Sequence, residues 1–253
     1  MFTKDKIFFE LKKQLAIDYN CSMSDFDKKE NILTLPAINC GRREYSEDSH
    51  FFSMVTLGEN AIISANEHIH SFLKDFIKNK KGFWLFEEDK LSDIQFQLAK
   101  YGQSLFQSHH MFLPDVKPLN FKPDFETRWF EQRNIEQFYG DKRFPNAFCE
   151  RYEVKRPDVL GICAVIDGEI AGMAGCSADS KIMWQIGIDV IPKFRRKGIG
   201  TILVGLLKDE IFKRGAIPFY GTGPANLHSQ SIAASCGFYP AWVEIESIES
   251  SGK

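Results

Sequence analysis

The stretch that decides the fold reads Ile186-Gly-Ile-Asp-Val-Ile-Pro-Lys-Phe-Arg-Arg-Lys-Gly-Ile-Gly-Thr201 and continues to residue 215. In residues 186–190 apolar side chains alternate with Gly and Asp, which is the period of a half-buried strand. From residue 199 onward apolar side chains recur every three or four positions, which predicts a helix. Gly215 follows the last periodic residues, and Lys213 and Arg214 before it carry the charge that a helix C-terminus favours. The stretch therefore predicts a strand, a short basic turn and a helix.

The predicted turn combines glycines and cations directly before a helix start. These residues are Arg195, Arg196, Lys197, Gly198 and Gly200. Unpaired backbone N–H groups and the macrodipole make a helix N-terminus attractive to anions, and glycine lets a phosphate approach the backbone. We therefore expect a diphosphate ligand. A Walker A loop does not fit because the Lys precedes the Gly, and a dinucleotide fingerprint does not fit because its third glycine position is Leu203.

The spacing that fits is Arg-x-x-Gly-x-Gly, at residues 195–200. A second apolar strand follows at residues 217–220, then Asn226, Ser229 and the pair Gly237-Phe238. This arrangement resembles motif A and the following elements of the GCN5-related N-acetyltransferases (GNAT), whose loop wraps the diphosphate of acetyl-coenzyme A. The resemblance covers roughly the second half of the chain. The chain also resembles a two-region bacterial group of this family that includes a zwittermicin A resistance acetyltransferase.

The resemblance implies acetyl-CoA as the acetyl donor and assigns residues to its site. The N–H of Ile188 would face the acetyl carbonyl and Val190 would pair with the pantetheine arm, on a strand that bulges at this point. The implied cofactor-binding residues are Ile188, Asp189, Val190, Arg195, Arg196, Lys197, Gly198, Ile199, Gly200, Thr201, Asn226 and Ser229.

Two positions depart from the family pattern. Ala233 stands where many members carry a tyrosine that protonates the departing thiolate, and Trp184 stands where some carry a glutamate base. Tyr220, at the end of the next strand, is our candidate for the acid. Other ionisable side chains nearby in the sequence are His228, Asp179 and Cys236, for which helix-face, loop-cap and buried-thiol roles are the simpler interpretations.

The composition excludes several classes of protein. The 253 residues carry 32 Lys and Arg against 34 Asp and Glu, so no basic excess points to nucleic acid or to a membrane surface. The first residues lack an apolar run long enough for a signal peptide, and we expect a cytoplasmic, bacterial protein that is a monomer or a homodimer. Six scattered cysteines are expected to be reduced and mostly buried, and the histidine pairs have no third ligand at a fixed spacing, so no metal site is expected.

The first half of the chain predicts a separate α+β region. Helices are expected near residues 6–17, from Asn66 to Gly82 and at 92–101, with strands at 32–35, 51–57, 61–65 and 103–113. Residues 113–124 contain three prolines and break regular structure. We therefore expect an N-terminal region at 1–120, which could be a degenerate copy of the same fold, and a GNAT domain at 121–253.

The order of elements in the second half predicts a mixed α+β fold, with a mostly antiparallel sheet that becomes parallel near the cofactor helix. Strands are expected at residues 125–130, 159–166, 169–176, 182–190 and 242–248, and a helical region broken at Pro145 is expected at 135–149.

Three functional hypotheses follow. The first is an acetyl-CoA-dependent N-acetyltransferase acting on a primary amine, favouring a small molecule over a protein. The second is an acyl-CoA-binding sensor with little turnover, and the third is an interaction protein with a GNAT-like domain. The sequence does not identify the acceptor amine.

Overall fold

The computed structural model describes residues 2–45 and 50–250, which form two compact units. The first unit comprises Met1–Ile7 and Phe112–Pro240, and the second comprises Phe8–Met111 and Ala241–Lys253. The boundary therefore lies near residue 112 rather than at 120, and the end of the chain belongs with the N-terminal region. The reason is strand pairing, because the last strand is hydrogen-bonded to strands of the second unit from residue 243 onward.

The first unit is built on a sheet in the order β5-β10-β9-β8-β7-β6. Its strands are β5 (His109–Pro114, shared with the second unit), β6 (Glu126–Glu131), β7 (Asp158–Ile166), β8 (Glu169–Ala178), β9 (Met183–Val190) and β10 (Ile217–Thr222). Strands β6 to β9 pair antiparallel, whereas β9 and β10 pair parallel. The expected mixed, mostly antiparallel sheet is confirmed.

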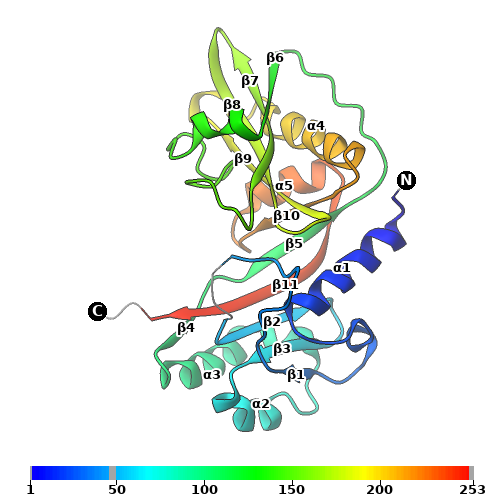
Figure 1. Cartoon of the computed structure of the whole chain (residues 1–253), viewed down its shortest axis with the longest axis vertical. Coiled ribbons are helices and arrows are strands. Elements are labelled where there is room, and N and C mark those ends of the chain that lie inside the picture. Colours follow the sequence, from blue (N-terminus) through cyan, green and yellow to red (C-terminus); the bar gives the residue numbers. More distant parts are fainter. Residues whose placement is uncertain (1, 46–49, 251–253) are drawn as a thin grey trace. The chain divides into compact units, whose positions relative to one another are not determined.

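Two helices pack on this sheet, α4 (Ile199–Lys213) and α5 (Leu227–Ser235). Figure 1 shows both helices beside β10. The apolar stripe of α4 is buried, with Leu203, Val204, Leu207 and Ile211 in one core with residues of β7, β8 and β9. Gly215 follows the helix with a φ of 81°, as expected of a glycine that ends a helix.

The prediction of a helical region at residues 135–149 is wrong. The structure has only the short 3₁₀ helix η4 (Gln132–Phe138), followed by turns. Gly140 adopts a positive φ of 73°, and Pro145 cannot supply an N–H to a helix. Several N–H groups in this segment are bonded instead by aspartate side chains: those of Asn146 and Ala147 by Asp189 and that of Cys149 by Asp158.

The second unit has its own sheet and helices. Its strands are β1 (Ile32–Thr34), β2 (Phe52–Thr56), β3 (Ala61–Ala65), β4 (Gln103–Leu105) and β11 (Phe238–Glu249, which begins in the first unit), in the order β1-β3-β2-β11 with β4 beside β11. Its helices are α1 (Lys4–Asp18, also shared), η1 (Met23–Asp27), η2 (Glu67–Ile69), α2 (His70–Phe76), η3 (Gly82–Phe86) and α3 (Glu88–Ala99). Its core is formed mainly by β2, β3, α2 and α3.

Two expectations for this unit need correction. The strand expected at residues 103–113 is two strands, β4 and β5, separated by three residues. The helix expected to continue to Gly82 ends at Phe76, and Asn79 adopts a φ of 59°, which breaks helical geometry. Asn66 does cap the start of this region, since its side chain accepts a hydrogen bond from the N–H of His68.

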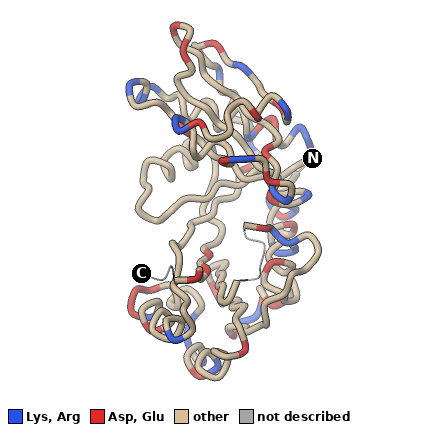
Figure 2. The backbone as a smooth tube through the Cα atoms, turned by 60° about the vertical axis from the view of Figure 1, so that its left-hand side comes forward, with Lys and Arg blue, Asp and Glu red and all other residues tan. Residues whose placement is uncertain are grey.

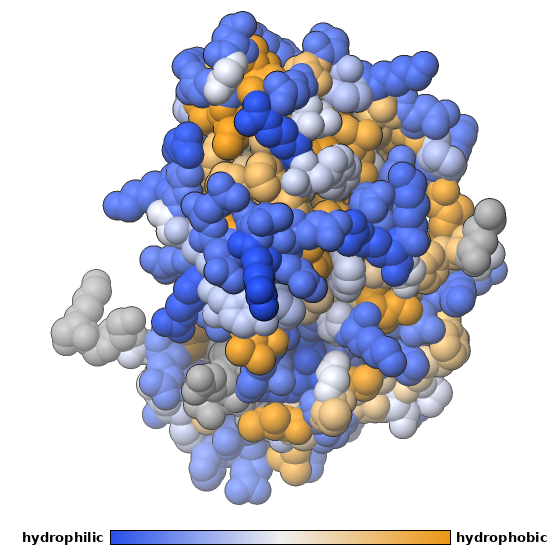
Figure 3. All heavy atoms as spheres, turned by 45° about the horizontal axis from the view of Figure 1, so that its top comes forward, coloured by the Kyte–Doolittle hydropathy of each residue, from blue (hydrophilic) through white to orange (hydrophobic). Residues whose placement is uncertain are grey.

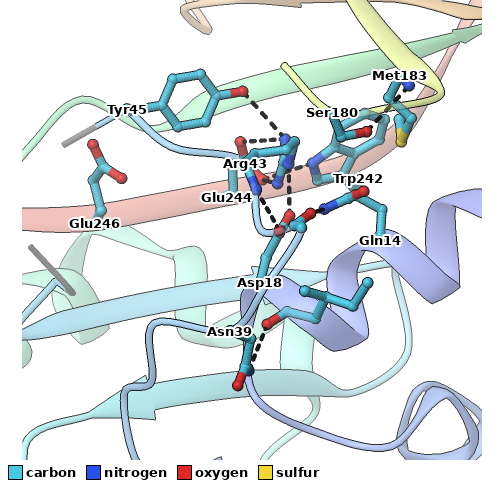
Figure 4. A network of polar contacts seen from close by, with 12 residues as sticks. Gln14, Asp18, Asn39, Arg43, Tyr45, Ser180, Met183, Trp242, Glu244 and Glu246 are labelled. Atoms are coloured by element: carbon cyan, nitrogen blue, oxygen red, sulfur yellow. Dashed lines mark hydrogen bonds and ion pairs between the residues drawn. The ribbon is translucent and has the colours of Figure 1, made fainter. Parts of the chain in front are cut away.

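A buried ionic network fixes β11 within the second unit (Figure 4). The guanidinium of Arg43 binds Asp18 at the end of α1 through Nε (2.6 Å) and Glu244 on β11 through Nη2 (2.8 Å). Trp242 donates its indole N–H to the same Glu244 carboxylate at 2.8 Å. These contacts join three segments that are far apart in the sequence.

The described surface is mixed in charge and hydropathy. Lys and Arg are interspersed with Asp and Glu along the backbone (Figure 2), and the face in Figure 3 shows hydrophilic side chains around smaller apolar areas. Within the described ranges, no helix is both long and apolar enough to cross a membrane, and no group of three or more metal-ligating side chains gathers. The six cysteines are free thiols, of which Cys163, Cys176 and Cys236 are buried.

Candidate functional site

The predicted strand, turn and helix are β9, a turn containing η5 (Pro192–Phe194), and α4. Gly198 is the N-cap of α4 and has a φ of 77°, a conformation that glycine adopts at little cost. A Cβ added to Gly198 would meet no heavy atom within 4 Å, so the space beside this residue is open. The turn thus presents a helix N-terminus to which an anionic group has access, which fits a diphosphate.

The cations of the turn have different tasks. Arg195 is exposed, and its Nε donates to the carbonyl of Val190 at 3.0 Å, so this side chain ties the turn to the end of β9. Arg196 and Lys197 are exposed, and neither forms an ion pair with a carboxylate of the described residues. Arg196 and Lys197 are therefore the cations available to neutralise an anion at the start of α4.

Gly200 and Ile199 seat the helix on the sheet. A Cβ on Gly200 would lie 3.1 Å from Cδ1 of Ile232 on α5 and within 3.7 Å of the side chains of Val190 and Ile188. The side chains of Ile188 and Val190 therefore point toward α4. Gly200 serves close packing, while Gly198 serves the turn.

The backbone of β9 is open on one side near its end. Pairing with β10 stops at the pair Ile186 and Tyr220, although β9 continues to Val190. The N–H of Ile191 points to β8, since it donates to Ala171 at 2.9 Å. Because successive N–H groups of a strand point to opposite sides, those of Ile188 and Val190 point away from β8, to the side on which pairing has ended.

The prediction of a bulge in β9 is wrong. Its pairing with β8 runs without a register shift from Trp184 to Val190, and the irregularities lie between β7 and β8. The backbone donors at Ile188 and Val190 are exposed by the end of the parallel pairing, without any bulge.

The start of α5 carries the second predicted part of the site. Asn226 caps the helix, with its Oδ1 accepting the N–H of Ser229 at 3.2 Å. The Ser229 hydroxyl lies 2.7 Å from the hydroxyl of Tyr220 on β10. Tyr220 is 2% exposed, and burial raises its pKa to about 12. The structure therefore brings Tyr220, Asn226 and Ser229 together, with the phenol protonated at neutral pH.

Asp189 faces the other side of the sheet. Its carboxylate accepts hydrogen bonds from the N–H of Asn146 (2.7 Å), the side-chain amide of Asn146 (2.6 Å) and the N–H of Ala147 (3.0 Å). It thereby holds residues 146–148 across β9, a segment that we call the strap. The direct cofactor contact implied for Asp189 remains a prediction, and the carboxylate already has these three partners.

A row of glycines lies under the strap, and the sequence analysis did not predict that these glycines are aligned. Gly161, Gly175 and Gly187 are register neighbours on β7, β8 and β9. A Cβ on Gly187 would lie 1.7 Å from the carbonyl oxygen of Asn146, and one on Gly175 would lie 2.1 Å from that of Ala147. Only glycine permits this approach, because any Cβ would displace the strap. The three glycines are visible in the sequence, but only the pairing register of β7, β8 and β9 shows that they are neighbours.

Two of the other ionisable candidates, Asp179 and Cys236, are hydrogen-bonded to neighbouring groups, whereas His228 is exposed. Asp179 is 1% exposed and accepts a hydrogen bond from Ser177 at 2.5 Å. Cys236 is buried, its thiol donates to the carbonyl of Thr201, and burial raises its pKa to about 12. Lys208, also buried, donates to the carbonyl of Cys236 at 2.8 Å and so caps the end of α5. These contacts support the structural interpretations of Asp179 and Cys236.

Comparison with known proteins agrees with this geometry. Residues 121–238, a little under half of the chain, match the acetyltransferase (GNAT) family model. No curated protein sequence matches the chain.

Three solved structures resemble the chain weakly. An acetyltransferase of the GNAT family from Novosphingobium aromaticivorans is 15% identical with a TM-score of 0.48, over 60% of this chain and 69% of that one. A GCN5-related N-acetyltransferase-like protein from Streptococcus suis is 13% identical with a TM-score of 0.49, over 80% and 86%. A GNAT acetyltransferase from Colwellia psychrerythraea is 13% identical with a TM-score of 0.43, over 57% and 56%. The assignment rests on the matched family model: the chain carries an acyltransferase domain of the GNAT family, formed by residues 121–238.

Proposed function

We propose that this protein transfers an acetyl group from acetyl-CoA to a primary amine, and that the acceptor is a small molecule. The observation that carries the proposal is the backbone of β9, where the N–H groups of Ile188 and Val190 point to the unpaired side of the strand directly before the glycine turn. Backbone donors beside an anion-binding turn suit a ligand that has a thioester carbonyl at one end and a diphosphate at the other.

Each element supplies one function in this proposal. The turn from Arg195 to Thr201 would hold the diphosphate, with Arg196 and Lys197 as the neutralising cations. Ile188 N–H would donate to the thioester carbonyl and so favour attack by a neutral amine, because a preorganised donor stabilises the developing oxyanion. Val190 N–H would bind the pantetheine arm.

Tyr220 is the proposed proton donor for the departing thiolate. The phenol is protonated at neutral pH, as a proton donor must be, and the hydrogen bond with Ser229 fixes the position of its hydroxyl. Ala233 supplies no donor, and the 2.7 Å contact of the Tyr220 hydroxyl with Ser229 at the start of α5 supports Tyr220 in this role. The place of the chain in the two-region bacterial group, and the role of the second unit, stay predictions.

Binding and turnover are tested separately. Saturating acetyl-CoA should raise the melting temperature, since a ligand that binds only the native state stabilises it. Release of free thiol should then depend on an added amine from a panel of small amines and peptides. A protein that binds acetyl-CoA but releases no thiol with any amine would support the acyl-CoA sensor. No binding at all would favour an interaction protein.

A further inference from the structure

Thr222, the last residue of β10, carries a buried hydroxyl that no described residue binds. The residue is 5% exposed, and its Oγ1 has no hydrogen-bond partner among the described residues. Burying a hydroxyl without a hydrogen bond is unfavourable, and such groups in native proteins call for an explanation. Thr56, also buried, shows the ordinary case, because its hydroxyl donates to the carbonyl of Asn60 at 2.7 Å and accepts from the N–H of Gly58 at 3.0 Å.

The position of Thr222 relates it to the open side of β9. Strands β9 and β10 are parallel, and their last register pair is Ile186 and Tyr220. Two residues further along each strand stand Ile188 and Thr222. Thr222 is therefore at the level of the residue whose N–H points to the side where pairing has ended, on the strand across from it.

The direction of the Thr222 side chain follows from strand geometry. Side chains two residues apart in a strand lie on the same face. Tyr220 lies on the face covered by α4 and α5, since it belongs to the core that includes Ile186 and Leu203, and its hydroxyl meets Ser229 on α5. Thr222 therefore points to this same face, which is also the face of the glycine turn and of the start of α4.

We propose that the Thr222 hydroxyl binds the pantetheine arm of acyl-CoA near its thioester end, by donating a hydrogen bond to an amide carbonyl of the arm. This inference rests on the proposed function and adds a contact from β10 to those from β9. A hydroxyl can donate and accept, so it matches a secondary amide, and the bond would satisfy a group that has no partner among the described residues.

The test is Thr222→Val, which removes the hydroxyl and keeps the shape of the side chain. Without ligand the variant should melt about 1–3 °C higher than the unaltered protein, because an unpaired polar group has been removed. Its dissociation constants for acetyl-CoA and CoA, measured by calorimetry, should rise about three- to tenfold. Affinity for 3′-phospho-ADP, which carries the diphosphate but no arm, should stay unchanged.

Two controls separate this role from a structural one. Thr56→Val removes a hydroxyl that is bonded in the protein, so it should lower the melting temperature and leave acetyl-CoA affinity unchanged. Thr222→Ser keeps a hydroxyl and should bind acetyl-CoA nearly as tightly as the unaltered protein.

Several results would overturn the inference. Equal acetyl-CoA affinity in Thr222→Val and the unaltered protein would show that the hydroxyl does not touch the arm, while leaving the proposed function intact. If Thr222→Val lost affinity for 3′-phospho-ADP to the same extent, the substitution would be acting on the diphosphate site, and this result would also contradict the inference. Failure of the unaltered protein to bind acetyl-CoA would overturn the proposed function and this inference together.

Discussion

Replacing Gly198 by Asn and by Asp separates the charge of the turn from its shape. The two side chains have nearly the same size, and both tolerate a positive φ better than other non-glycine residues do. Gly198 has a φ of 77°, and a Cβ added there meets no heavy atom within 4 Å. The variants therefore differ mainly by one negative charge at the start of α4.

The size of the effect follows from this geometry. Both variants should lose about 1 kcal/mol of stability to the left-handed conformation, or about 2–4 °C in melting temperature. If the diphosphate binds at this turn, a carboxylate placed roughly 6 Å from one of its phosphates would add about 1–3 kcal/mol of repulsion at an effective dielectric constant between about 20 and 80. Gly198→Asp should then bind acetyl-CoA about 5- to 100-fold more weakly than Gly198→Asn.

Calorimetric titration with acetyl-CoA at low and high salt measures this difference. The gap between the two variants should narrow as salt rises, because screening shortens the range of the repulsion. Equal affinities for Gly198→Asn and Gly198→Asp at low salt would refute the placement of the diphosphate at this turn. Without ligand, Gly198→Asp should melt at the same temperature as Gly198→Asn or slightly above it, because a negative charge is favourable at a helix N-terminus.

Three further predictions concern the chemistry and the strap. Tyr220→Phe should lower kcat at least roughly tenfold with acetyl-CoA affinity unchanged. A normal rate would show that Tyr220 is a packing residue of the core and not the proton donor. Burial raises the pKa of Asp158 from 3.8 to about 6, so its contribution to stability is present below about pH 4 and is lost as pH rises through 6. Between these pH values the free energy of unfolding of Asp158→Asn should therefore change by up to about 3 kcal/mol less than that of the unaltered protein. Asp141 has a lowered pKa, so Asp141→Asn should differ from the unaltered protein in the opposite direction. Gly187→Ala should displace Asn146 and cost about 1–3 kcal/mol in urea unfolding, and unchanged stability would mean that the strap is not packed on the glycine row.

Local patterns in the sequence predicted the part of the fold that positions the site. The alternation in β9, the apolar stripe of α4 and the glycine after it are short-range signals, and all three elements lie where we expected them. Asn226 likewise behaves as the helix cap that its residue type favours.

Long-range pairing could not be predicted in the same way. The strap lacks a helix because its N–H groups bond to Asp189, some forty residues further along the chain, and its path depends on Gly161, Gly175 and Gly187 being register neighbours. The return of β11 to the second unit depends on its strand partners and on the Arg43 network. The orphan hydroxyl of Thr222 was equally hidden, because burial and the absence of a partner are properties of the folded chain.

The central claim is that β9, the glycine turn and α4 form a site for acetyl-CoA. Calorimetric titration of the unaltered protein with acetyl-CoA tests it most directly, with 3′-phospho-ADP as the ligand that reaches the turn alone. We predict saturable binding of both ligands at one site per chain, with acetyl-CoA binding more tightly through its arm. If neither acetyl-CoA nor 3′-phospho-ADP binds, the proposed site at β9, the glycine turn and α4 is wrong.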